Sequence, residues 1–277
     1  MPRLPLRLLP AAATPYLAVY ATRFRALLQY RTAALAGLAT QFFWGLIRMM
    51  IFVAFYRSAT DATDIPMPLA DTITYVWLGQ ATLLVMPWNV DRDVNEMIRS
   101  GAVGYELVRP IDLHGMWYAR ALAMRTAPVM LRFVPMMAVV GWIGWLQPPP
   151  TMAAGLAFGA SILSAALLSA AITVFLNVTM FWTVSGEGII RLAPGVLILC
   201  SGLIIPLPMF PAPVTAVLEW LPFAGLMDVP FRLYTGLIPA SDAWWQIARQ
   251  LVWTGAIVIA GRWLLSRGVR RTVMQGG

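Results

Sequence analysis

The stretch MAAGLAFGASILSAALLSAAITVFLNVTMF, residues 152–181, contains no charged residue. A helix needs about 20 mostly apolar residues to cross the hydrocarbon core of a bilayer, which is about 30 Å thick. This stretch therefore predicts a membrane-spanning helix that is long enough to tilt or to extend beyond the bilayer.

The composition of the whole chain also indicates that lipid, not water, surrounds most of it. Of its 277 residues, 60% are hydrophobic and 12% are charged, against about 25% charged residues in a soluble domain. The net charge of +8 arises from arginine without any lysine. A basic excess can indicate nucleic acid or an anionic membrane surface, and the hydropathy favours membrane lipid over nucleic acid.

Outward from residues 152–181, five more stretches are apolar enough to span. The sequence thus predicts an all-α polytopic membrane protein with six transmembrane helices. The fifth of them is short and ends in prolines. The predicted spans are 33–55, 72–88, 117–145, 152–181, 192–207 and 244–265.

Arginines orient these predicted spans. Six crossings place both termini on one side, and cytoplasmic loops carry an excess of basic residues. Only Arg57 and Arg232 fall in loops on the opposite side, so we predict cytoplasmic N and C termini. The arginines on the side of the termini are Arg3, Arg7, Arg23, Arg25, Arg31, Arg92, Arg99, Arg109, Arg120, Arg191, Arg267, Arg270 and Arg271.

Two cytoplasmic segments have amphipathic patterns. Residues 14–31 predict an elbow helix lying along the inner leaflet, with an extension of the first span as the alternative. The polar stretch DRDVNEMIRSGAVGYELVRPIDLHG, residues 91–115, places Val94, Met97 and Ile98 on one helical stripe. A short amphipathic helix of this kind suits docking into a groove of a cytoplasmic partner, and a solvated loop is the alternative.

Two further features concern a pathway. Residues 206–240 are apolar but interrupted by prolines, which predicts short re-entrant helices on the external side, or else a periplasmic loop. Arg48, Arg125 and Arg132 lie within predicted spans without a carboxylate at comparable depth. Such charges are expensive and indicate either a polar pathway or side chains that snorkel. We favour snorkelling for Arg48 and Arg125, and Arg132 is the best candidate of the three for lining a route for an anionic group.

The motifs of two regions resemble one family. The run from Asp91 to the tetrapeptide LVRP at 107–110 is similar to the cytoplasmic segment of ABC-2 type exporter permeases, in the subgroup with one ATPase gene and two permease genes. The resemblance covers nearly the whole chain. Its later motifs are SGLIIPL at 201–207, Phe210-Pro211, Leu221-Pro222-Phe223, Pro230 and Gly236.

This resemblance implies a single ABC-2 type transmembrane domain over residues 1–277. Within it, segment 91–113 would hold the coupling helix that fits a cleft in an ATPase, and 206–240 would close the pathway from outside. The implied ATPase-coupling residues are Glu96, Arg99, Glu106 and Arg109. Glu187, in the turn at 185–188, is a further candidate for this contact, with a plain connector between two spans as the alternative. The pathway or gate candidates are Arg132, Pro206, Pro208 and Pro230.

The implied function is the permease subunit of an ATP-binding-cassette exporter in a bacterial inner membrane. The chain has no GxxxxGK[ST] motif, so ATP and Mg would be bound by two copies of a partner ATPase, and a second permease, identical or paralogous, would complete the complex. An ion- or proton-coupled secondary transporter or channel is the alternative, but acidic residues are missing from the spans. A membrane enzyme or scaffold is a third class. No metal-ligand spacing or catalytic cluster is visible, so we expect neither a metal site nor an enzyme.

Overall fold

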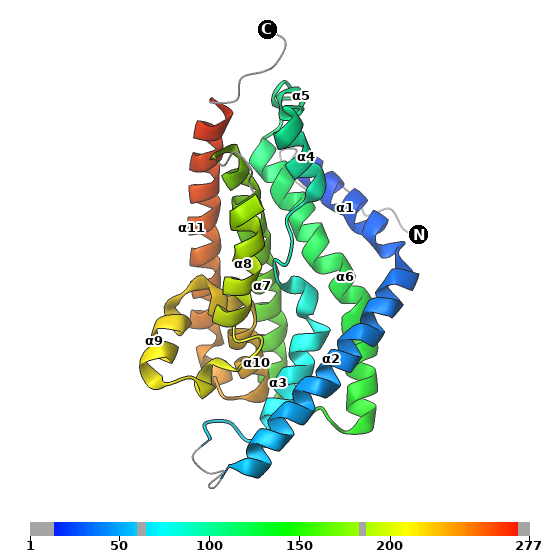
Figure 1. Ribbon diagram of the computed structural model, residues 1–277, viewed down its shortest axis with the longest axis vertical. Helices are drawn as coiled ribbons and strands as arrows, with labels where there is room; N and C mark the ends of the chain where they lie inside the picture. The colour runs from blue at the N-terminus through cyan, green and yellow to red at the C-terminus, as the bar shows by residue number, and fades with distance from the viewer. Residues whose placement is uncertain (1–13, 60–64, 183–186, 271–277) are drawn as a thin grey trace.

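The computed structural model describes residues 14–59, 65–182 and 187–270, and these contain helices but no strand. The helix α7, Met152–Thr179, lies at the centre (Figure 1). The helices α6 (Leu113–Ile143), α10 (Asp228–Thr235) and α11 (Ala243–Val269) all pack against it. Small buried residues such as Ala165, Ala166 and Ala170 let these neighbours approach its backbone closely.

Three helices in the described part of the chain are long and apolar enough to cross a membrane. They are α2 (Arg31–Ser58), α6, and α7 continued by the 3-10 turn η4 (Met180–Trp182). The sixth predicted span corresponds to α11, which covers the whole of residues 244–265. The described part of the chain is therefore all-helical and contains apolar helices of membrane-spanning length.

The second predicted span is not a single helix. The helix α3, Leu69–Ala81, ends early, and the 3-10 turn η3 (Leu83–Val85) and a non-helical stretch follow it. The hydroxyl of Thr82 donates to the carbonyl oxygen of Leu78 at 2.7 Å, and Pro87 has no N–H with which to continue a helix. An apolar sequence alone did not reveal this break.

The fifth predicted span is also shorter at its C-terminal end. The helix α8, Glu187–Cys200, begins before residue 192 and stops well before residue 207. Gly202 has a φ of +77°, a left-handed conformation that favours glycine. The chain therefore leaves the helix just after Cys200 instead of near Leu207.

The helices have two distinct ends (Figure 1). The helices α1 (Thr14–Leu28), α4 (Arg92–Ser100) and α5 (Val103–Leu107) lie toward the end where α11 finishes, which we call the α4 end. A turn at Gln29 and Tyr30 separates α1 from α2, and α1 packs along α6. Residues 14–28 thus form a separate helix, and not an extension of the first span.

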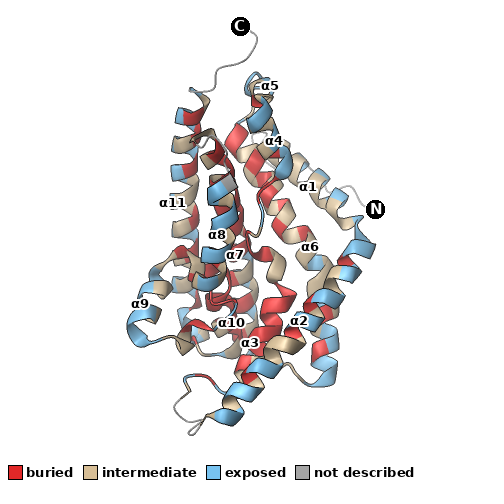
Figure 2. Ribbon diagram, viewed as in Figure 1, coloured by how far each residue is buried: buried red, intermediate tan, exposed pale blue. Residues whose placement is uncertain are grey.

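Residues 206–240 form short helical pieces at the opposite end, which we call the α10 end. These are η5 (Leu207–Met209), α9 (Ala212–Trp220), η6 (Pro222–Leu226) and α10, followed by η7 (Ala240–Asp242). Most of α10 is buried, whereas no residue of α9 is (Figure 2). One leg of this hairpin is thus part of the core and the other is a surface.

Candidate functional site

The local sequence of α4 sets both of its ends. The Asp91 carboxylate accepts a hydrogen bond from the backbone N–H of Asp93 at 3.1 Å, as an N-cap does. Asp93 places a second negative charge in the first turn, where it interacts favourably with the helix dipole. Gly101 ends the helix in the left-handed conformation, with a φ of +76°. The short helix predicted here from the sequence is therefore present.

The apolar stripe of α4 faces inward. Val94 is fully buried, and Met97 and Ile98 pack against the same apolar cluster, which includes Trp117 of α6 and Val178 of α7. We expected this stripe to dock into a partner, but the structure uses it to attach α4 to the rest of the chain. The surface left for a partner is the opposite, polar face.

Two carboxylates fasten α4 to two other helices. Asp91, almost fully buried, accepts from Arg120 Nε of α6 at 2.9 Å, and Asp93 accepts from Arg120 Nη2 at 2.6 Å. Arg23 Nη2 of α1 lies 3.3 Å from the Asp93 carboxylate. Because breaking a buried ion pair costs far more than breaking an exposed one, Asp91 and Arg120 are the firm part of this attachment. These charged side chains thus join α4 to α1 and α6.

The outer face of α4 and α5 combines charge with exposed apolar groups. Glu96 and Arg99 are exposed, as the amphipathic pattern predicts. Beyond them, Tyr105 is 79% and Val108 is 82% exposed. Exposed aromatic side chains are typical anchors of protein interfaces. The sequence argument named only charged contacts here and missed these two residues, although both lie in the motif that carries the family resemblance.

The other three predicted coupling residues, Glu106, Arg109 and Glu187, lie in two different places. Glu106 and Arg109 pair with each other, with Arg109 Nη1 3.2 Å from Glu106 Oε2. Glu187 is the first residue of α8, and its side chain and the rest of the turn at 183–186 lie outside the described residues. The two ends of the chain, residues 1–13 and 271–277, also lie outside them.

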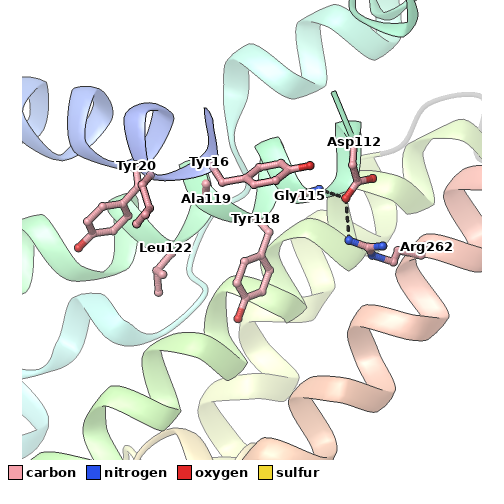
Figure 3. A pocket seen from close by; sticks show the side chains of 9 residues that line it. Tyr16, Tyr20, Asp112, Gly115, Tyr118, Ala119, Leu122 and Arg262 are labelled. Carbon is pink, nitrogen blue, oxygen red and sulfur yellow. Dashed lines mark hydrogen bonds and ion pairs between the residues drawn. The ribbon is translucent and has the colours of Figure 1, made fainter. Parts of the chain in front are cut away.

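Another ion pair joins the start of α6 to α11 beside this site. The Asp112 carboxylate caps α6 by accepting from the N–H of Gly115 at 3.0 Å, and it accepts from Arg262 of α11 at 2.6 Å (Figure 3). A pocket of about 390 Å³ lies between α1, α6 and α11 next to this pair. A Cβ at Gly115 would lie 2.7 Å from the ring of Tyr16, so only glycine lets α1 approach here.

The proline candidates lie around a buried carboxylate at the α10 end. Pro206 and Pro208 flank Leu207, whose N–H donates to Asp228 at 3.1 Å, and Pro230 follows Asp228 in α10. Asp228 is fully buried. We call Asp228 and its partners the Asp228 cluster.

This cluster joins α10 to three other parts of the chain. The Tyr75 hydroxyl of α3 lies 2.9 Å from the Asp228 carboxylate and 3.0 Å from the Gly202 carbonyl oxygen. Arg232 lies 3.3 Å from the same carboxylate and also binds Glu219 of α9. The sequence argument named Arg232 and the prolines in this region but not Tyr75, which is distant in sequence.

Arg48 and Arg125, which we expected to snorkel, instead donate to backbone carbonyl oxygens of the protein. Arg125 is buried and donates to the Met86 carbonyl oxygen at 2.9 Å, to the Asn89 carbonyl oxygen, and to Thr173 Oγ1 at 3.0 Å. It therefore satisfies carbonyls that the break after α3 leaves without helical partners.

Arg48 and Arg132 have different environments. Arg48 donates to the carbonyl oxygens of Leu203 and Ile204, the latter at 3.0 Å, just beyond the end of α8. Arg132 lies against Gly37 of α2, where its guanidinium occupies the space of a missing side chain. Of the three, Arg48 and Arg125 line a common cavity, and Arg132 is not among the residues of its wall.

The apolar helices and the polar α4 end define a helical, multi-pass membrane protein. A family model described as "ABC-2 family transporter protein" matches residues 46–276, and the chain belongs to this family. No curated protein and no solved structure matches the chain. Family membership makes it the membrane component of an ABC transporter and implies that it works with an ABC ATPase.

Proposed function

We propose that this chain is the permease subunit of an ATP-driven exporter and that segment 91–113 docks onto a separate ATPase. The observation that supports it is the construction of α4 and α5. Arg23 and Arg120 hold α4 through Asp91 and Asp93, while Tyr105 stands exposed beside it. A contact surface that is fixed to α1 and α6 is suited to passing a movement of the partner into the bundle.

The proposed complex contains two permeases, identical or paralogous, and two ATPases, which bind ATP and Mg. In it the chain crosses a bacterial inner membrane six times, and both termini and the α4 end are cytoplasmic. The amphipathic α1 lies along the inner leaflet, and the hairpin 206–240 closes the pathway from outside. Light scattering of the purified complex tests the stoichiometry, and ATP-dependent uptake into inverted vesicles tests the export direction.

Removing the exposed apolar anchors should weaken assembly. The double variant Tyr105→Ser, Val108→Ser is expected to bind the ATPase encoded beside it at least ten-fold more weakly, because a central aromatic anchor contributes about 2 kcal/mol or more. The measurement is co-purification, followed by titration of the ATPase onto the permease in nanodiscs. Tyr30→Ser is the matched control, since Tyr30 is 66% exposed at the junction of α1 and α2. Equal affinity of wild type and double variant would contradict the docking surface.

Charge reversal tests the polar part of the same surface. Glu96→Arg and Arg99→Glu are each expected to reduce assembly or to uncouple ATP hydrolysis from transport, by about two- to ten-fold, because charges at an interface rim act mainly through steering and register. ATPase activity and transport are measured together on the same vesicles. Arg57→Glu, an exposed arginine at the far end of α2, is the control. Intact assembly with coupled transport in both variants would count against the proposal.

A further inference from the structure

A cavity of about 540 Å³ lies between the middle of α2, the segment from α3 through Asn89, and the end of α8. Sites for small organic ligands measure about 300–1,000 Å³ and combine apolar walls with a few polar groups. The wall of this cavity fits that description. Its polar and aromatic members include Gln41, Trp44, Arg48, Gln80, Trp88 and Arg125.

Two glutamines of this wall lack partners. Gln41 is 4% and Gln80 is 3% exposed. Within the described residues, the Nε2 and Oε1 of Gln41 and the Oε1 of Gln80 have no hydrogen-bond partner. A buried polar group left unpaired costs about 1–3 kcal/mol, so two such side chains on one cavity wall point to a polar occupant.

The charge of the wall indicates the sign of that occupant. Arg48 and Arg125 both line the cavity, and its lining residues include no carboxylate. The hydrogen bonds of Arg125 are taken up by Met86, Asn89 and Thr173. Arg48 donates from Nη2 to the carbonyl oxygens of Leu203 and Ile204, but its Nε has no partner among the described residues. An uncompensated guanidinium in a bilayer-spanning region is matched by an anion.

The remaining wall is apolar and aromatic. Trp44 stands at the rim, about half exposed, and Trp88 is fixed by its Nε1–H, which donates to the Leu83 carbonyl oxygen at 2.8 Å. Leu203 and Ile198 complete this side. An occupant thus meets a cationic and amide-lined part together with a surface that binds rings or alkyl chains.

We propose that this cavity binds an amphipathic anion, with its anionic group at Arg48 and Gln41 and its apolar body against Trp44 and Trp88, and that compounds of this class are the transported substrate. That these compounds are transported rests on the proposed exporter function. Binding itself requires neither the ATPase nor ATP. The same chemistry belongs to anionic lipids and to free organic acids, so the test separates these two sources.

The test compares two dyes that share one ring system. Anilinonaphthalene sulfonate carries a sulfonate, and N-phenylnaphthylamine does not. Each is titrated onto the full-length chain in phosphatidylcholine nanodiscs, alone and with its ATPase, and the signal of empty nanodiscs is subtracted. We expect saturable binding of the sulfonate at least ten-fold tighter than that of the neutral dye. Competition by added phosphatidylglycerol supports a lipid occupant of the site, and lack of competition supports a free organic acid.

Variants separate ligand binding from folding. Gln41→Leu is expected to weaken sulfonate binding about ten-fold without lowering the thermal unfolding temperature, because Gln41 makes no hydrogen bond within the described residues. Arg48→Gln should weaken it at least as much. Arg57→Gln, an exposed arginine farther along α2, should bind like wild type. In the complex, the sulfonate should stimulate ATP hydrolysis. The concentration of sulfonate that gives half-maximal stimulation should be about ten-fold higher for Gln41→Leu than for wild type.

Two results would overturn the inference. One is equal affinity of the wild type for the charged and the neutral dye. The other is unchanged sulfonate binding in both Gln41→Leu and Arg48→Gln. If a chain that still assembles with its ATPase gives either result, the proposed binding site is refuted and the proposed exporter function is not. If the chain binds the sulfonate selectively but does not assemble with the ATPase, only the proposed exporter function is refuted.

Discussion

Replacing Arg125 by methionine is expected to lower the thermal unfolding temperature of the purified protein by about 10 °C. The guanidinium serves the carbonyl oxygens of Met86 and Asn89 and the hydroxyl of Thr173. The Met86 carbonyl oxygen keeps the Trp88 N–H as a donor, but all three acceptors lose a hydrogen bond from a charged group. Such a bond contributes about 1.5–3 kcal/mol, and about 1 kcal/mol shifts the midpoint by about 2–4 °C in a chain somewhat smaller than this one. The measurement is a thermal unfolding series in one detergent, followed by size-exclusion chromatography.

Arg132→Met is the matched control for this experiment. Arg132 lies two turns farther along α6, and its guanidinium contacts Gly37 without donating a hydrogen bond in the described part of the chain. Its replacement should shift the midpoint by only a few degrees. A similar midpoint for wild type and Arg125→Met would show that the guanidinium does not hold the broken second span.

Replacing Asp228 by leucine is expected to destabilise the protein by about 3–5 kcal/mol. Leucine has a similar volume but leaves the Tyr75 hydroxyl, the Leu207 N–H and one contact of Arg232 without the carboxylate. Removal of one member of a buried ion pair costs this much because its partner remains buried. Hydrogen exchange should rise first in residues 201–235, which this cluster connects.

Two further variants qualify that result. Asp228→Asn keeps an acceptor for Tyr75 and Leu207 while removing the charge, so we expect a smaller loss, about 1–2 kcal/mol. Asp242→Asn changes an exposed aspartate at the same end of the molecule and should leave stability within about 0.5 kcal/mol of wild type. Equal stability of Asp228→Leu and wild type would contradict the role of the cluster.

Hydropathy predicted where the chain is helical and apolar but not where its helices end. Residues 152–181 became the central helix because nothing in them is unfavourable in a buried or lipid environment. Residues 82–88 are equally apolar, and a short apolar run does not distinguish a helix from irregular backbone. The available signals were Pro87 and an unpaired arginine in another span. These two signals indicate a break in the second span only when the structure shows that Arg125 binds the backbone beside Pro87.

The candidate site was predicted in part. Residue spacing placed Val94, Met97 and Ile98 on one stripe of α4, but it did not indicate whether a partner or the chain itself covers that stripe. The ties from Arg23 and Arg120 to α4 join residues far apart in sequence, and a single sequence offers many such pairs of opposite charge. Tyr105 was overlooked because coupling was attributed to charge alone.

The contact between Arg125 and the stretch after α3 has a consequence for biogenesis. Asn89 leaves the ribosome before Arg125, so its carbonyl oxygen lacks this donor when it first meets the translocon, whereas the Met86 carbonyl oxygen already accepts from the Trp88 N–H. An unpaired carbonyl and a lone arginine are each costly in lipid, and together they neutralise much of that cost. In the proposed topology, we therefore expect the second and third crossings to enter the bilayer as one hairpin, each incomplete until the other arrives.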